Sequence, residues 1–132
     1  MTPEQVEAAL AEERRQIAQS IEADPVGTYD RLTGGNWGPG LAKWVPENMR
    51  PGVVRYVLLG VRPGSFLCAI IEGDYYEACR RADETNRAAL WHYAMFFHNY
   101  APGGCFGSRD HLVGWVRDGG MMGEPAKEAQ PC

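Results

Sequence analysis

The stretch DETNRAALWHYAMFFHNYAP, residues 83–102, has the pattern of a long helix around which the rest of the chain can pack. Asp83 is a good N-cap, and Pro102 ends the segment because the residue before a proline is disfavoured in helical geometry. Between these two residues, apolar side chains recur at three- and four-residue spacing, which is typical of one helix face. The residues on this face are Leu90, Tyr93, Phe97 and Tyr100.

A second face of the same segment is also apolar, since it carries Trp91, Met95 and His98. A helix that is apolar nearly all round is typically buried. With roughly 18 residues it would be ~27 Å long, about the diameter of a small domain. We therefore predict one buried central helix at about 84–100.

Length and composition favour one globular domain. The chain has 132 residues, of which 45% are hydrophobic and 23% charged, and this is ordinary for a folded protein with a true core. No run approaches the ~20 apolar residues of a membrane-spanning helix, and the acidic N-terminus does not resemble a signal peptide. We expect a cytoplasmic protein that makes no membrane contact and keeps its four cysteines reduced.

The N-terminal helix and a segment near the middle have recognisable boundaries. Thr2 and Gln5 form a capping box with Pro3 at the first helical position, so a helix is expected to run to about Ala23. Residues 53–59 fit either a helix or a short buried strand. We predict the helix, bounded by a proline and a glycine, because no partner strand is recognisable elsewhere.

These patterns predict an all-α single domain of five or six helices around the central one. Ser65, Asp74 and Ser108 are expected to cap three shorter helices. The chain is predicted to divide into an acidic helix at 1–23, a Gly/Pro/Trp-rich loop at 24–46, a helical core at 47–120 and a mobile tail at 121–132.

The negative charge is concentrated near the N-terminus. Residues 1–24 carry six acids and two arginines, which accounts for the whole net charge of −4. This argues against broad binding of nucleic acid, which requires a basic face. The alternative is a small nucleic-acid-binding regulator whose basic face forms by convergence of four arginines from the neutral remainder. These are Arg80, Arg81, Arg87 and Arg109.

The 24–46 segment contains two tryptophans, whose large apolar side chains favour burial. Trp37 and Trp44 either cover the core or form an exposed aromatic anchor for a partner. We treat them, together with Glu12 and Glu13 of the acidic helix, as the candidate partner-binding residues.

The candidate catalytic chemistry centres on one cysteine. Cys105 lies in a glycine-rich turn near a helix start, where a thiolate is favoured, and His98 and His111 are close in sequence. A structural zinc site needs four ligands at recognisable spacing, and only these three gather here. We predict no metal or cofactor, and a turn cysteine with two hydrogen-bonded histidines in place of a Cys/His-dependent enzyme.

Residues from about 50 to 117 resemble small uncharacterised proteins encoded by phages, prophages and other mobile elements. The resemblance rests on PGSFL at 63–67, RAD at 81–83 with Asn86, NYAP at 99–102, Gly107-Ser108 and Trp115. Phe106 departs from the pattern, because relatives often have a tryptophan before Gly-Ser. The resemblance implies a viral or mobile-element setting and supplies no catalytic residues.

The resulting hypothesis is a non-enzymatic protein that binds a host protein or protein complex stoichiometrically in the host cytoplasm. Inhibition of a defence system, as by anti-CRISPR proteins, is the form that the phage setting favours. An acidic helix can imitate the phosphates of a nucleic acid toward a basic groove.

Overall fold

The computed structural model describes residues 1–123, and every regular element in that range is a helix. This confirms the predicted all-α single domain, although the helices are shorter and more numerous than the five or six expected. The α-helices are α1 (Pro3–Ala23), α2 (Pro25–Leu32), α3 (Gly38–Trp44), α4 (Arg50–Leu59), α5 (Ser65–Glu72), α6 (Tyr75–Arg81), α7 (Glu84–Ala88), α8 (Leu90–Tyr100) and α9 (Arg109–Arg117). The described residues also contain three single-turn 3-10 helices, η1 (Glu47–Met49), η2 (Gly103–Cys105) and η3 (Gly120–Met122).

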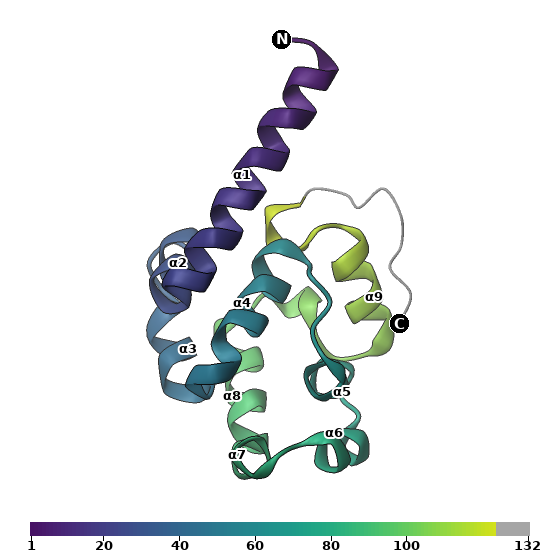
Figure 1. Ribbon diagram of the computed structural model, residues 1–132. Coiled ribbons are helices and arrows are strands. Elements are labelled where there is room, and N and C mark those ends of the chain that lie inside the picture. Colours follow the sequence, from purple (N-terminus) through teal and green to yellow (C-terminus); the bar gives the residue numbers. More distant parts are fainter. Residues whose placement is uncertain (124–132) are drawn as a thin grey trace.

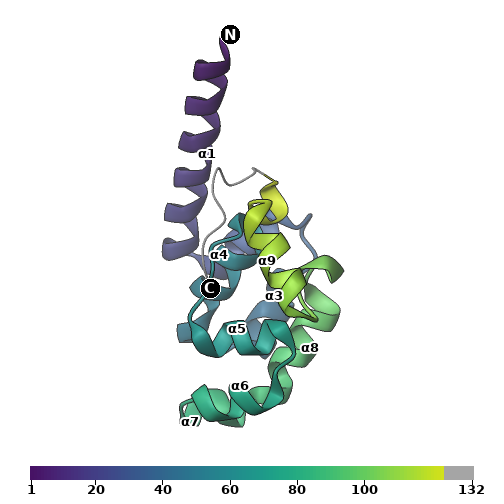
Figure 2. The same cartoon turned by 90° about the vertical axis from the view of Figure 1, so that its right-hand side faces the viewer.

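The molecule has a compact body with one long projection. Helices α2 to α9 form the body, and the N-terminal half of α1 stands clear of it in both views (Figures 1 and 2). Helices α6 and α7 lie at the opposite end of the body from this projection. Of the predicted mobile tail, only residues 121–123 are described, and the remainder of that prediction lies outside the described residues. No helix within residues 1–123 combines the length and apolarity needed to cross a membrane.

The predicted central helix is two helices. Residue Ala89 leaves helical geometry with φ −101° and ψ 10°, and α7 departs from the axis of α8 (Figure 2). A buried polar contact joins the two pieces, because the hydroxyl of Tyr93 donates to Oδ1 of Asn86 at 2.6 Å. Burial of α8 is also one-sided, since Tyr93, Phe96 and Phe97 are buried whereas Trp91 is 60% exposed. The prediction of a helix buried all round is therefore wrong.

The predicted loop at 24–46 is also wrong, because it contains α2 and α3. Asp24 ends α1 and caps α2, its carboxylate accepting from the Gly27 N–H at 3.0 Å, while Pro25 occupies the first turn. Asp30 in α2 then holds the start of α3 by accepting from the Gly38 N–H at 3.0 Å. Two short capped helices thus occupy a segment whose glycine and proline content resembles that of a loop.

Most of the predicted helix boundaries are confirmed. Residues 53–59, which the sequence allowed as helix or strand, lie in the helix α4. This helix is followed by Gly60 in the left-handed conformation, with φ 67°. Asp74, Asp83 and Ser108 each accept a hydrogen bond from the backbone of the helix that follows. Ser65 does not cap α5, because it is the first helical residue and Gly64 takes the N-cap position.

Arg14 is one of the residues that connect α1 to the body. The Arg14 guanidinium donates to the carbonyl of Leu59 at 2.6 Å and to that of Gly119 at 3.3 Å, and so connects α1 to the end of α4 and to the chain just before η3. Below it, Ile17 and Ile21 are the buried residues of α1.

Replacement of Arg14 by methionine is expected to lower the free energy of unfolding by about 1.5–3 kcal/mol, since charge-assisted hydrogen bonds to two carbonyls are lost. Urea denaturation measures the change. Arg15→Met is the matched control, because Arg15 is exposed and pairs with Glu12 on the same helix. A loss at Arg14 no larger than that at Arg15 would contradict the fastening role.

Candidate partner-binding surfaces

The projection of α1, residues 1–13, is here called the arm. Its residues 1–11 are all exposed, yet the helix begins with the predicted capping box between Thr2 and Gln5. The apolar stripe of α1 includes the buried residues Ile17 and Ile21. In the arm the stripe consists of Val6 and Leu10, whose side chains are 41% and 42% exposed. The arm is therefore a well-defined amphipathic helix whose apolar stripe no other part of residues 1–123 buries.

The arm is acidic without any compensating base of its own. It contains four glutamates and no lysine or arginine. Glu13 is exposed, and Glu12 forms an ion pair with Arg15 and accepts from Gln16 Nε2 at 3.2 Å. Both predicted partner-binding acids thus lie on the solvent-exposed projection.

The two predicted partner-binding tryptophans do not adjoin the arm. Trp37 is half-buried beside Tyr29, with ring centroids 6.3 Å apart. Trp44 is half-buried at the end of α3, where its ring lies 5.6 Å from that of Trp91 on α8. Its indole Nε1 is buried and has no hydrogen-bond partner among the described residues. Figures 1 and 2 separate α3 from the arm, so the four residues do not form one continuous surface.

A groove lies against the uncovered face of α8. This face carries Trp91, Ala94, Met95 and His98, at the spacing of one helical face, and Tyr75 and Ala78 of α6 line the groove with them. The groove measures about 790 Å³ and is mainly apolar. The prediction that this second face is buried is wrong, because periodicity shows that a helix face is apolar without showing what covers it.

The lining of the groove also includes Arg87, Asp74 and His98. Arg87 of α7 donates from its guanidinium to the Ala82 carbonyl at 3.2 Å. The carboxylate of Asp74 accepts from the Glu77 N–H at 3.1 Å and so caps α6. His98 is exposed on α8. The groove thus combines an apolar lining with a few charged or titratable groups.

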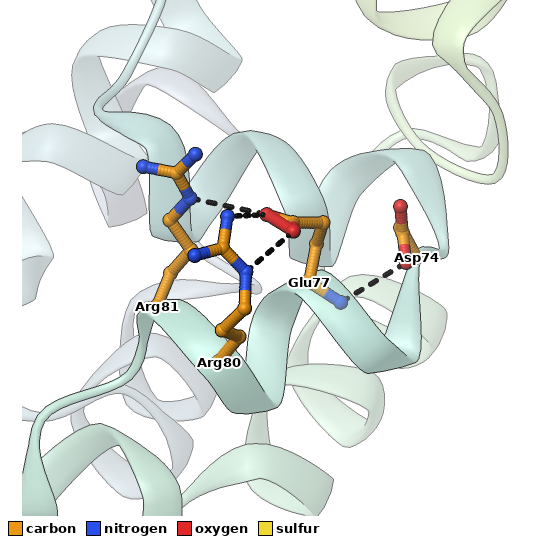
Figure 3. Close-up of polar contacts among 4 residues, drawn as sticks. All are labelled: Asp74, Glu77, Arg80 and Arg81. Carbon is orange, nitrogen blue, oxygen red and sulfur yellow. Dashed lines mark hydrogen bonds and ion pairs between the residues drawn. The ribbon is translucent and has the colours of Figure 1, made fainter.

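The predicted basic face is partly neutralised. Arg80 and Arg81 both bind the carboxylate of Glu77, at 2.8 and 3.0 Å from Arg80 and 3.1 Å from Arg81 (Figure 3). These hydrogen bonds lower the pKa of Glu77 to about 2, so the carboxylate stays ionised at neutral pH. Arg87 and Arg109 lie on two other helices, α7 and α9. These contacts join the first two arginines to an acid, which weakens the case for a phosphate-binding cluster.

Cys105 has an environment that disfavours nucleophilic chemistry. Its side chain is fully buried, and burial raises the pKa of the thiol to about 12. The thiolate expected from its position in a glycine-rich turn is therefore not favoured. His98 and His111 are exposed, and the imidazole of His111 is 2.7 Å from the Ser108 hydroxyl. Within residues 1–123, no three His, Cys, Asp or Glu side chains are placed to hold a metal ion.

Comparisons of the chain with protein-family models, curated proteins and solved structures find no match. The resemblance to phage and mobile-element proteins therefore stays a prediction.

Proposed function

We propose that the protein acts by stoichiometric binding of another protein, and that the arm makes the contact. The observation that carries this proposal is an ordered, capped, acidic helix that projects from the body with Val6 and Leu10 exposed. Short helices are marginal in water, and most helical stability in proteins comes from packing an apolar face. A partner that covers the stripe would supply that packing.

The negative charge of the arm favours a partner with a positively charged surface. Four glutamates flank or adjoin the apolar stripe, so the complementary surface carries lysines and arginines beside an apolar slot. Nucleic acid would be repelled by the same charge. A protein groove that normally receives nucleic acid has the required charge, and the arm would occupy it as a mimic of phosphates.

Inhibition of a host defence complex, in the manner of an anti-CRISPR protein, is the specific form of this proposal. It combines the acidic arm with the phage or mobile-element setting implied by the resemblance. Proteins that bind guide or target nucleic acid hold it in positively charged channels, which are suitable targets for an acidic helix.

Reversing two charges on the arm is expected to abolish partner binding. Glu12→Lys with Glu13→Lys adds repulsion toward a basic surface and leaves the buried residues of α1 unchanged. The measurement is affinity capture from host lysate followed by mass spectrometry, with the full chain as bait. The partner retained by the wild type should be absent from the variant, and its retention should fall steeply with added salt.

The matched control is Glu47→Lys with Glu72→Lys, which makes the same change in net charge on the body, away from the arm. This control should retain the partner. Capture that survives the arm reversal and is insensitive to salt would refute mimicry, and equal loss in both variants would show that only net charge matters.

A further inference from the structure

Exposed apolar side chains gather where the arm leaves the body. Arg14 donates to the carbonyls of Leu59 and Gly119, and the arm rises from this point (Figure 1). The two segments beyond these carbonyls touch, because a Cβ built at Gly60 would lie 2.5 Å from the Gly120 nitrogen. Exposed apolar residues follow on both segments and also precede Arg14 on the arm. They are here called the junction patch and are Val6, Leu10, Val61, Met121 and Met122, each between 37% and 43% exposed.

We infer that the junction patch binds a basic amphipathic α-helix of the partner protein, which lies along the arm with its apolar face on the patch. The inference rests on the proposed function, in which the arm makes the contact. It adds the form of the partner element and a contribution from the body. Exposed apolar residues gathered at one place are typical of interaction sites. Methionine is frequent at surfaces that receive amphipathic helices, because its flexible side chain adapts to the partner.

The shape of the junction patch favours a helix. Val6 and Leu10 are one turn apart, so their side chains form a single row along the arm. Rows of side chains at four-residue spacing are the surfaces through which helices pack against each other. One turn beyond Leu10, the Arg14 guanidinium contacts the carbonyl of Gly119, and the two methionines of η3 follow directly. A partner helix along the row therefore reaches the methionines at its end.

The charges beside the row favour a basic partner helix. At about 100° per residue, Glu7 and Glu13 lie on opposite sides of the row, within ~80° of it, whereas Glu4 and Glu12 are each ~140° from it. Both flanking acids are exposed. The nearest base, Arg14, is engaged by two carbonyls of the body. Lysines or arginines on both sides of an apolar face, as in a basic amphipathic helix, complement this pattern. The arm of a second copy would present the same acids and would be repelled.

The test measures binding of fluorescently labelled synthetic peptides to the full chain by anisotropy. The probe peptide has leucines at three- and four-residue spacing and lysine or alanine elsewhere. One control peptide has the same composition in an order that spreads the leucines around the helix, and a second has glutamate in place of lysine. Wild-type protein is expected to bind the probe at least about tenfold more tightly than the first control and not to bind the second.

Charge reversal at two pairs of glutamates tests the orientation of the partner helix. Glu7→Lys with Glu13→Lys places bases on both sides of the row and should weaken probe binding at least about tenfold. Glu4→Lys with Glu12→Lys makes the same change in net charge further around the same helix and should weaken binding less than about threefold. Circular dichroism of both variants shows whether the arm stays helical.

Polar substitutions test the apolar residues of the junction patch. Leu10→Gln, and separately Met121→Gln with Met122→Gln, should each weaken probe binding about tenfold, since each removes apolar area from the contact. Met95→Gln is the matched control, because Met95 is 37% exposed on the groove face of α8, outside the patch. It should leave probe binding unchanged.

Three results would each overturn the inference: equal binding of the probe and its rearranged control, equal weakening by the two charge reversals, or full binding by the double methionine variant. Self-association that Leu10→Gln abolishes would also overturn it, since a second copy would then cover the patch. The proposed function fails by a different result, which is capture of the same lysate proteins by the wild type and by the variant with Glu12→Lys and Glu13→Lys.

Discussion

Replacing Gly60 by alanine is expected to lower the free energy of unfolding by more than about 3 kcal/mol. Gly60 has φ 67°, and a Cβ built there would lie 2.5 Å from the backbone nitrogen of Gly120. Gly120 is equally constrained, because its own Cβ would lie 2.3 Å from the Gly60 nitrogen. The end of α4 and the start of η3 therefore pass each other with backbone against backbone. No flexible side chain lies between them that could move aside to make room for a Cβ.

The control for this prediction is Gly35→Ala. Gly35 has φ 79°, but no heavy atom of any residue other than Gly35 and its two chain neighbours lies within 4 Å of its Cβ position. It should lose only the ~1–2 kcal/mol that a left-handed conformation costs an L-residue. Urea denaturation of both variants separates the two effects, since their difference reports the close approach alone. Equal losses at the two sites would show that the chains at Gly60 and Gly120 can move apart freely.

Phe97→Ala is expected to cost ~3–5 kcal/mol, because it removes a large ring from the buried face of α8 and leaves a cavity. Phe97 is 2% exposed, and its ring packs against those of Phe96 and Phe106 at centroid distances of 5.1 and 5.7 Å. The measurement is again the free energy of unfolding in urea.

The comparison on the same helix is Trp91→Ala, which removes an even larger ring from the groove face. Trp91 is 60% exposed, so its truncation should cost less than about 1.5 kcal/mol, most of it from lost contacts with Trp44 and His92. Similar losses for both variants would mean that the groove face is packed as tightly as the core. The predicted difference is a direct test of the one-sided burial of α8.

Helix boundaries that depend on nearby residues could be predicted from the sequence. The Thr2–Gln5 capping box and the caps at Asp74, Asp83 and Ser108 are confirmed. A side-chain cap acts within three residues, so its partners are adjacent in the sequence as well as in space. The same local signal was present at Asp24 before Pro25, but the glycines and prolines of 24–46 obscured it.

The candidate surfaces were predicted only in part. The acidic character of the arm follows from the positions of its glutamates, whereas its projection from the body depends on where α1 meets α4. Trp44 belongs beside Trp91, a contact between α3 and α8 that no local pattern indicates. The groove was missed because Trp91, Met95 and His98 have the same spacing whether a neighbouring helix covers them or not.

The amino-acid sequence by itself determined the helical class of the described residues, most helix starts and stops, and the concentration of charge at the N-terminus. These properties arise from interactions within about one helical turn or from composition alone. Tertiary structure decided the break at Ala89, the backbone crossing of Gly60 and Gly120, and the exposure of one apolar face of α8. The physical reason is that burial depends on which distant segments meet, and the sequence pattern of one helix records its apolar faces without recording their neighbours.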